Sequence, residues 1–174
     1  MQPVHEHALS DGTRVVIRPV EPGDRPRLAA AMAKLSRESV RRRFLAAKPS
    51  LSGTELRYLT EVDGAHHLAL VAVLADDPEQ IAGVARCIRL APGSDTAEFA
   101  IVVGDALQGQ GLGRLLGRAL AAAAAGAGIR RFTATALADN VAIERLIEGF
   151  ATRVDHLPTA GGLSEMLAEL PRAA

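Results

Sequence analysis

The chain has 174 residues, 48% of them hydrophobic, and its 20 Lys and Arg residues balance its 20 Asp and Glu residues. This length is enough for one domain with a buried core and short for two, and the zero net charge argues against binding to nucleic acid or anionic lipid. The longest apolar run, at residues 119–125, is far shorter than the ~18 residues that cross a bilayer. Residues 1–6 lack the basic and apolar segments of a signal peptide. A cytoplasmic protein is therefore expected.

We expect residues 1–10 to form a flexible N-terminus and residues 11–174 to form a single domain. The spacing of apolar residues and the turn and cap residues predict the elements of that domain. Asp24 is the predicted N-cap of the first helix, with Pro26 in its first turn. In chain order, the predicted elements are a strand at 14–20; helices near 26–34, 37–46 and 52–60; strands near 67–75, 80–90 and 96–103; a helix at 112–127; a strand at 131–137; a helix at 140–148; and strands near 152–157 and 163–170.

Turn residues at 76–79 and 91–95 join three consecutive strands as hairpins, and a strand–helix–strand unit follows them. This order predicts an α/β fold with a mixed, mostly antiparallel central sheet and helices on both faces. Gly117, inside the predicted helix 112–127, has two explanations, close packing on the sheet or contact with a ligand. The apolar stripe of that helix consists of Leu112, Leu115, Leu116, Ala119, Leu120 and Ala123.

A glycine-rich turn lies between the predicted strand 96–103 and the predicted helix 112–127. Its sequence is Gln108-Gly109-Gln110-Gly111-Leu112-Gly113-Arg114. The first main-chain N–H groups of a helix have no partner within the helix, and the helix dipole adds partial positive charge there. Glycines let a phosphate group approach such amides without a Cβ atom in the way. The turn therefore predicts a site for a phosphate-bearing cofactor.

The spacing of the turn excludes two common phosphate-binding motifs. Gln110 and Gly111 stand where a Walker loop requires Lys and a hydroxyl residue. Arg114 or Leu116, depending on the register, replaces the third glycine of a dinucleotide fingerprint. The pattern that fits is Gln/Arg-x-x-Gly-x-Gly/Ala, with Gln108, Gly111 and Gly113 in the fixed places.

With these residues the chain resembles the GNAT superfamily of N-acetyltransferases, whose pyrophosphate loop for coenzyme A has this pattern. The likeness extends to the strand 131–137, Asn140, the helix that follows and Gly149-Phe150. Residues 11–20, 35–44 and 69–73 further resemble bacterial protein-lysine acetyltransferases of the Pat type. The resemblance implies a GNAT fold, with a sheet splayed between its fourth and fifth strands, and acetyl-CoA as cosubstrate.

The same resemblance assigns cofactor contacts. In the family the splayed strand pairs its free main-chain groups with the pantetheine arm, and the glycine loop holds the diphosphate. A main-chain N–H of the strand, that of Ile101 or a neighbour, would stabilise the oxyanion. The implied cofactor-binding residues are Ile101, Val102, Val103, Gln108, Gly109, Gln110, Gly111, Leu112, Gly113, Arg114 and Asn140. No group of Cys, His, Asp and Glu has the spacing of a metal site, so no metal is predicted.

Glu98 is the predicted general base, because the resemblance places an acidic residue on this strand and Glu98 is the only carboxylate between residues 97 and 103. An alkylamine has a pKa of about 10.4 and must lose a proton before it attacks a thioester. We expect Glu98 to act through partial desolvation or through a water molecule. The alternative is a structural glutamate that pairs with Arg86 or Arg89.

No general acid is evident. Many family members carry a tyrosine in the helix after the asparagine, and here Ile147 occupies that position. The only tyrosine, Tyr58, lies in the predicted third helix, so water is expected to protonate the thiolate, whose thiol has a pKa of about 8.5. Cys87 is expected to be a small buried hydrophobic residue. Four arginines in the predicted second helix are expected to form a solvated face, with contact to an acidic acceptor or a cofactor phosphate as the alternative: Arg37, Arg41, Arg42 and Arg43.

These observations predict an N-acetyltransferase that moves the acetyl group of acetyl-CoA to a primary amine by direct attack in a ternary complex. The acceptor is expected to be a protein lysine. Two alternatives remain open, a catalytically weak or inactive CoA-binding sensor or scaffold, and an acyltransferase acting on a small-molecule amine. The resemblance also favours a homodimer, because terminal strands in the family pair with a second subunit.

Overall fold

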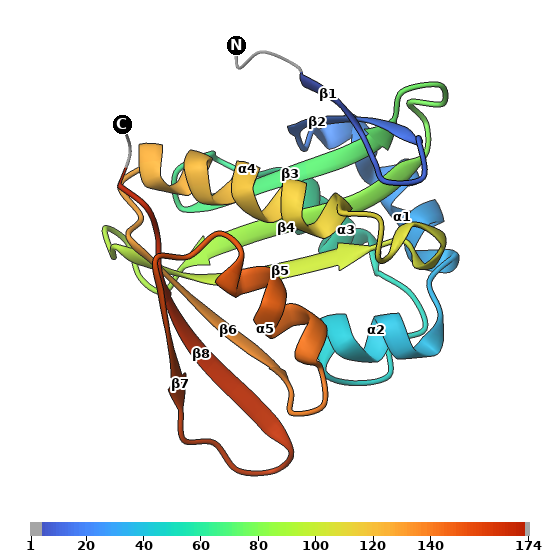
Figure 1. The fold of residues 1–174 in the computed structure, drawn as a ribbon. Helices are drawn as coiled ribbons and strands as arrows, with labels where there is room; N and C mark the ends of the chain where they lie inside the picture. The colour runs from blue at the N-terminus through green and yellow to red at the C-terminus, as the bar shows by residue number, and fades with distance from the viewer. Residues whose placement is uncertain (1–4, 173–174) are drawn as a thin grey trace.

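The structure, a computed structural model, describes residues 5–172 (Figure 1). Its elements agree with the predicted ones at nearly every position, and most bounds differ by two residues or fewer. Within the described residues, no helix has the length and apolar character needed to span a membrane. The elements are β1 (His5–Ala8), β2 (Arg14–Pro19), α1 (Arg25–Ala33), α2 (Arg37–Phe44), α3 (Gly53–Thr60), β3 (His67–Leu74), β4 (Ile81–Arg89), β5 (Thr96–Val103), α4 (Leu112–Gly126), β6 (Arg131–Leu137), α5 (Val141–Glu148), β7 (Arg153–Leu157) and β8 (Leu163–Glu169).

The strands form one sheet of eight, in the order β1-β2-β3-β4-β5-β6-β8-β7. All neighbours are antiparallel except β5 and β6, which run parallel. Helix α4 buries Leu112, Leu116 and Leu120 in the larger core on one face. Leu28 of α1 and Leu59 of α3 pack in a smaller core on the other face. The predicted mixed, mostly antiparallel α/β sheet with helices on both faces is confirmed.

Residues 5–8, which we expected within a flexible terminus, instead form β1. This strand pairs with β2 from His5↔Ile17 to Ala8↔Arg14. Leu9, directly after the strand, is buried, and its N–H donates to the carbonyl of Thr13 at 2.8 Å. The four residues His-Glu-His-Ala carry no apolar alternation, so the pattern could not reveal a polar edge strand. Residues 1–4 of the predicted terminus lie outside the described part of the chain.

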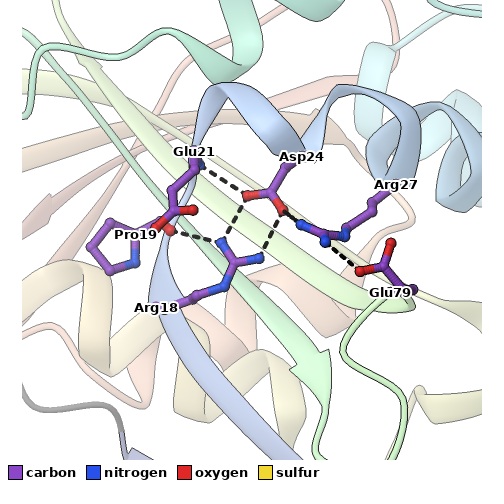
Figure 2. A network of polar contacts seen from close by, with 6 residues as sticks. All are labelled: Arg18, Pro19, Glu21, Asp24, Arg27 and Glu79. Carbon is purple, nitrogen blue, oxygen red and sulfur yellow. Dashed lines mark hydrogen bonds and ion pairs between the residues drawn. The ribbon is translucent and has the colours of Figure 1, made fainter.

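Asp24 stands at the predicted N-cap of α1, but its side chain does not cap the helix. Figure 2 shows instead a cluster of polar contacts in which the buried Asp24 carboxylate accepts two hydrogen bonds from Arg18, at 2.7 and 2.8 Å. Arg27 donates a third at 3.1 Å, and the main-chain N–H of Glu21 a fourth at 2.9 Å. Burial alone would raise the pKa of Asp24, but these hydrogen bonds outweigh it and hold that pKa below its ordinary value. The cluster ties the start of α1 to β2.

The sheet splays between β5 and β6. Strand β5 pairs with β4 along its whole length, from Arg89↔Ala97 to Gly83↔Val103. Its pairing with β6 ends at Glu98↔Thr133, and beyond that point the two strands diverge (Figure 1). These are the fourth and fifth predicted strands, renumbered because β1 was missed. The predicted splay is confirmed, and it leaves one edge of β5 without a neighbouring strand after residue 98.

Candidate active site

A cleft of about 690 Å³ opens where β5 and β6 diverge. Its walls come from β5, the glycine loop, the end of β6, the start of α5, and the C-terminal half of α2. Most of the predicted site residues lie in this lining: Glu98, Ile101, Val102, Val103, Gln108, Gly109, Gly111, Gly113, Arg114 and Asn140. Residues far apart in the sequence therefore meet at one opening.

The glycine loop has the backbone that its sequence demands. Gly109 and Gly111 adopt φ values of +76° and +92°, in the left-handed region that side chains disfavour. No atom lies within 4 Å of a Cβ built on either residue, so the space beside the loop is open. Leu115 donates to the Gly111 carbonyl at 3.2 Å, which places the N–H groups of residues 112–114 before the first full helical turn. An anionic group fits beside these amides.

Gln110 and Leu112 do not line the cleft. Leu112 is 1% exposed and points into the core beneath the sheet. The Gln110 carbonyl accepts hydrogen bonds from the main-chain N–H and the hydroxyl of Ser10, both at 3.1 Å. This contact fastens the loop to the turn after β1.

Gln108 uses its side chain to hold the loop in place. Its Nε2 donates to the Val103 carbonyl at 3.1 Å and to the Ser39 hydroxyl at 3.0 Å. Asp105, which the sequence did not single out, accepts from the Ser39 hydroxyl at 2.8 Å. It also accepts from the hydroxyl and main-chain N–H of Ser36 at 2.7 and 2.9 Å. Gln108 and Asp105 thus join the start of α2 to the end of β5.

The two helical glycines next to the loop create space for α5. A Cβ on Gly113 would lie 2.7 Å from Leu146 Cδ1. A Cβ on Gly117 would lie 2.9 Å from two ring carbons of Phe150. Of the two explanations for Gly117, sheet packing and ligand contact, neither holds, because the residue packs against the segment that ends α5.

Glu98 lies on the face of β5 that is turned away from α4, and its exposed carboxylate faces the cleft. The alternative pairing with Arg86 or Arg89 is absent from the described residues. Arg86 donates to the Leu59 carbonyl at 3.1 Å, and Arg89 donates to main-chain carbonyls, that of Ala65 at 2.8 Å among them. Glu98 is therefore free of a structural ion pair.

Arg43 of α2 is the basic group that acts on Glu98 electrostatically. Burial lowers the pKa of Arg43, and the negative charge of Glu98 opposes that effect. The guanidinium carbon lies 4.8 Å from the ring centre of Phe44. Arg43 thus departs from the solvated face expected for the arginines of α2. Arg42 pairs with Glu38 on the same helix, and it also lines the cleft.

The cleft lining of the described residues contains no Tyr, His or Cys side chain. Ile147 is 1% exposed and belongs to the core, while Leu146 lines the cleft. Tyr58 is exposed and lies outside the cleft, with its ring centre 5.2 Å from that of His67 and the two ring planes tilted by 42°. Cys87 is fully buried as expected, and burial raises its pKa to about 12. The arrangement offers a carboxylate base and no side-chain acid of suitable pKa.

Asn140 occupies the N-cap position of α5 without a hydrogen bond from its side chain to that helix. The side chain lies in the cleft lining, near the end of β6. Its amide is therefore available to a ligand at the splay.

Comparisons with known proteins agree with this geometry. The profile of the acetyltransferase (GNAT) domain matches residues 14–150. Acetyltransferase Pat of Mycolicibacterium smegmatis is 36% identical over 139 residues, which cover 76% of this chain and 39% of that protein. Acetyltransferase PA5475 of Pseudomonas aeruginosa is 31% identical over 140 residues, which cover 80% of this chain and 75% of that protein.

Among solved structures, the GNAT domain of S. lividans PAT superposes with a TM-score of 0.85 and 28% sequence identity. The match covers 96% of this chain and 97% of that domain. The chain spans well under half the length of its M. smegmatis relative.

Proposed function

The chain belongs to the GNAT acetyltransferase family, and we propose that it transfers the acetyl group of acetyl-CoA to a primary amine that enters the cleft beside Glu98. One observation carries this proposal. The free edge of β5 and the open glycine loop at the start of α4 line the same cleft. A ligand that carries both an amide-rich arm and a diphosphate matches these two surfaces together.

The residues present fit such a cofactor. The N–H groups of Gly113 and Arg114 and the exposed Arg114 side chain would hold the diphosphate. Hydrogen bonds to a charged acceptor contribute roughly 1.5–3 kcal/mol each. The main chain of residues 101–103 would pair with the pantetheine arm, and Asn140 would contact the cofactor from the opposite wall. Acetyl-CoA would supply the thioester carbonyl that an amine attacks.

Glu98 would remove a proton from the incoming ammonium group, directly or through water. The need for a base is large, because three pKa units between a pKa of about 10.4 and neutral pH correspond to roughly 4 kcal/mol. A main-chain N–H on the free edge of β5, that of Ile101 or a neighbour, would stabilise the developing oxyanion. Water would protonate the departing sulfur, since the lining provides no side-chain acid.

The acceptor is the finer part of the proposal. The likeness to Pat supports a protein lysine as the first amine to test. The described cleft lining contains no Tyr, His or Cys that could act as a general acid. This absence favours one alternative, a domain that binds CoA and transfers acetyl groups slowly or not at all.

Two measurements test the function. Calorimetry with CoA and acetyl-CoA should register binding, and a thiol-release assay with lysine peptides and small amines should register turnover. Glu98→Gln should keep CoA affinity and lose turnover by about 10²–10⁴-fold. Glu148→Gln, which changes an exposed carboxylate outside the cleft, is the matched control and should behave as the wild type.

The outcomes separate the alternatives. Absence of heat with CoA on folded protein would overturn the proposal entirely. Binding without turnover on any amine would favour the sensor. Full turnover by Glu98→Gln at all pH values would remove this residue from the chemistry.

A further inference from the structure

A second cavity, of about 470 Å³, adjoins the cleft on the face of the sheet covered by α1 and α3. Its walls are mostly apolar, with Leu28, Leu59 and Val84 among them. Four residues line both spaces and form the boundary between them: Arg43, Phe44, Val102 and Leu107. The volume is within the range of small-molecule sites, roughly 300–1,000 Å³.

Among the charged residues in the described lining, Lys34, Arg43, Arg86 and Asp105, Arg86 is the buried one, at 4% exposed. Its Nη1 donates to the Leu59 carbonyl at 3.1 Å and lies 3.0 Å from Nε2 of His67. Burial and the repulsion of Arg43 lower the pKa of Arg86 to about 9. Burial also lowers the pKa of His67, to about 4, so this imidazole is neutral and accepts the hydrogen bond.

Arg86 has no carboxylate partner among residues 5–172, since no ion pair of the described chain includes it. A buried cation without a counter-charge is unfavourable unless something else compensates it. Arg43 and Lys34 add two more positive charges to the described lining of the cavity, and Asp105 is its single carboxylate. Asp105 already accepts hydrogen bonds from Ser36 and Ser39, and Glu98 acts on Arg43 from the neighbouring cleft. The site therefore has an excess of positive charge that an anionic ligand group would balance.

The strand register relates Arg86 to the predicted base. Arg86 lies opposite Ala100, and Glu98 lies opposite Ile88, so Arg86 and Glu98 are diagonal neighbours on adjacent strands. The α-carbons of diagonal neighbours on one face of a sheet are roughly 7–8 Å apart, and their side chains extend from the same side of the sheet. A small ligand that contacts both side chains therefore carries its amine and its anionic group a few atoms apart.

From this juxtaposition we propose that the acceptor is a free amino acid with an apolar side chain. Its amine lies beside Glu98, its carboxylate lies between Arg43 and Arg86, and its side chain fills the apolar cavity. This inference rests on the proposed acetyl transfer and names its substrate class. A lysine within a protein has no carboxylate next to its ε-amine, so it leaves the charge of Arg86 uncompensated.

The reaction balances without a further reactant. The amine nitrogen forms a bond to the acetyl carbon, the carbon–sulfur bond breaks, and its electron pair stays on sulfur. The ammonium group loses two protons, of which one leaves through Glu98 to solvent and one neutralises the thiolate. The products are the N-acetyl amino acid and free CoA.

The test compares L-leucine with L-leucinamide as acceptors at saturating acetyl-CoA. An α-amine next to an amide has a pKa of about 7.7–8.0, so leucinamide offers more free base at neutral pH and is favoured by chemistry alone. We expect kcat/KM for leucine to exceed that for leucinamide at least tenfold. Equal use of the two acceptors would overturn the inference.

Variants then assign the effect to the buried guanidinium. Arg86→Met should lower kcat/KM for leucine at least tenfold, mainly through KM, and leave the value for leucinamide unchanged. Arg57→Met, which removes an exposed arginine of α3 outside both cavities, is the matched control. Calorimetry with CoA reports whether each variant is folded.

A binding experiment on the wild type avoids reliance on folding of the variant. With CoA present, N-acetyl-L-leucine should bind at least tenfold more tightly than N-acetyl-L-leucinamide. Succinyl-CoA with leucinamide distinguishes the donor from the acceptor as the source of the carboxylate, and faster turnover there than with acetyl-CoA and leucine would refute the inference. Turnover of lysine peptides without turnover of leucine would refute the amino-acid acceptor and leave the proposed acetyl transfer intact. Absence of binding heat with CoA would refute both the acceptor and the acetyl transfer.

Discussion

Gly117→Ala tests whether the glycines of α4 serve helix packing. The new Cβ would lie 2.9 Å from the Phe150 ring, so the contact must open by roughly 0.6–1.1 Å to reach ordinary carbon–carbon distances of about 3.5–4.0 Å. Phe150 cannot easily give way, because it is 7% exposed and its ring centre lies 5.5 Å from that of Phe99 and 6.2 Å from that of Phe132.

The magnitude follows from two opposing effects. Overpacking a filled core costs about 1–3 kcal/mol, and replacing a helical glycine by alanine returns about 0.5–1 kcal/mol. We expect a net loss of roughly 1–2 kcal/mol in the free energy of unfolding, which lowers Tm by roughly 2–8 °C for a chain of this size. CoA affinity should not change, because Gly117 does not line the cleft.

Gly126→Ala, at the other end of the same helix, is the control. No atom lies within 4 Å of its Cβ position and its φ is not in the left-handed region, so this change should stabilise the protein by about 0.4–1 kcal/mol. Urea unfolding of both variants, with CoA calorimetry on each, gives the comparison. A Gly117→Ala protein as stable as Gly126→Ala would show that Phe150 does not restrict this position, and a selective loss of CoA binding would restore the ligand-contact explanation.

Three further predictions concern single side chains. Asp24→Asn should cost about 2–4 kcal/mol of unfolding free energy at neutral pH, because it leaves the partly buried guanidinium of Arg18 without its carboxylate. The pKa of Asp24 is lowered in the folded state, so its carboxylate stabilises the fold above the ordinary pKa of about 3.9, and this stabilisation is lost as the pH falls through the folded pKa. Urea unfolding from pH 7 to pH 3 should therefore show a smaller decrease in the free energy of unfolding for the variant than for the wild type. Parallel curves for the two proteins would contradict this. Cys87, with its pKa raised to about 12, should react with a thiol reagent only in denaturant, and rapid labelling of folded protein would show that the strand opens. Gln108→Ala removes the hydrogen bonds to Val103 and Ser39, and calorimetry should show a roughly two- to tenfold weaker CoA affinity, whereas an unchanged affinity would mean that the loop holds its shape without them.

Elements with strong apolar periodicity were predictable from the sequence. The predicted helix 112–127 is observed as Leu112–Gly126, and the predicted strand 131–137 is observed with the same bounds. In both segments one face is buried, so the pattern of the sequence records the packing directly. Strand β1 escaped prediction because its polar residues owe their conformation to the neighbouring strand β2.

The site was predictable only where a local backbone requirement marks it. Gly109 and Gly111 adopt the left-handed conformation that only glycine takes readily, so the residue type itself is the signal. Asp105 gave no such signal, because its partner Ser36 lies 69 residues away in the sequence. The burial of Arg86 was equally invisible, since an arginine in a strand is more often exposed than enclosed.

The splay divides β5 into two parts with different mechanical support. Glu98 is the last residue of β5 that pairs on both sides, with Ile88 of β4 and Thr133 of β6. Residues 99–103 keep only the β4 side, so their other main-chain groups face the cleft. A catalytic base works best on a rigid element, whereas a backbone that binds an amide-rich ligand must leave its hydrogen bonds unmade until the ligand arrives. The end of pairing at residue 98 therefore suits both proposed roles within one strand, because the proposed base stands at the last fully paired residue and the proposed cofactor-binding edge follows directly after it.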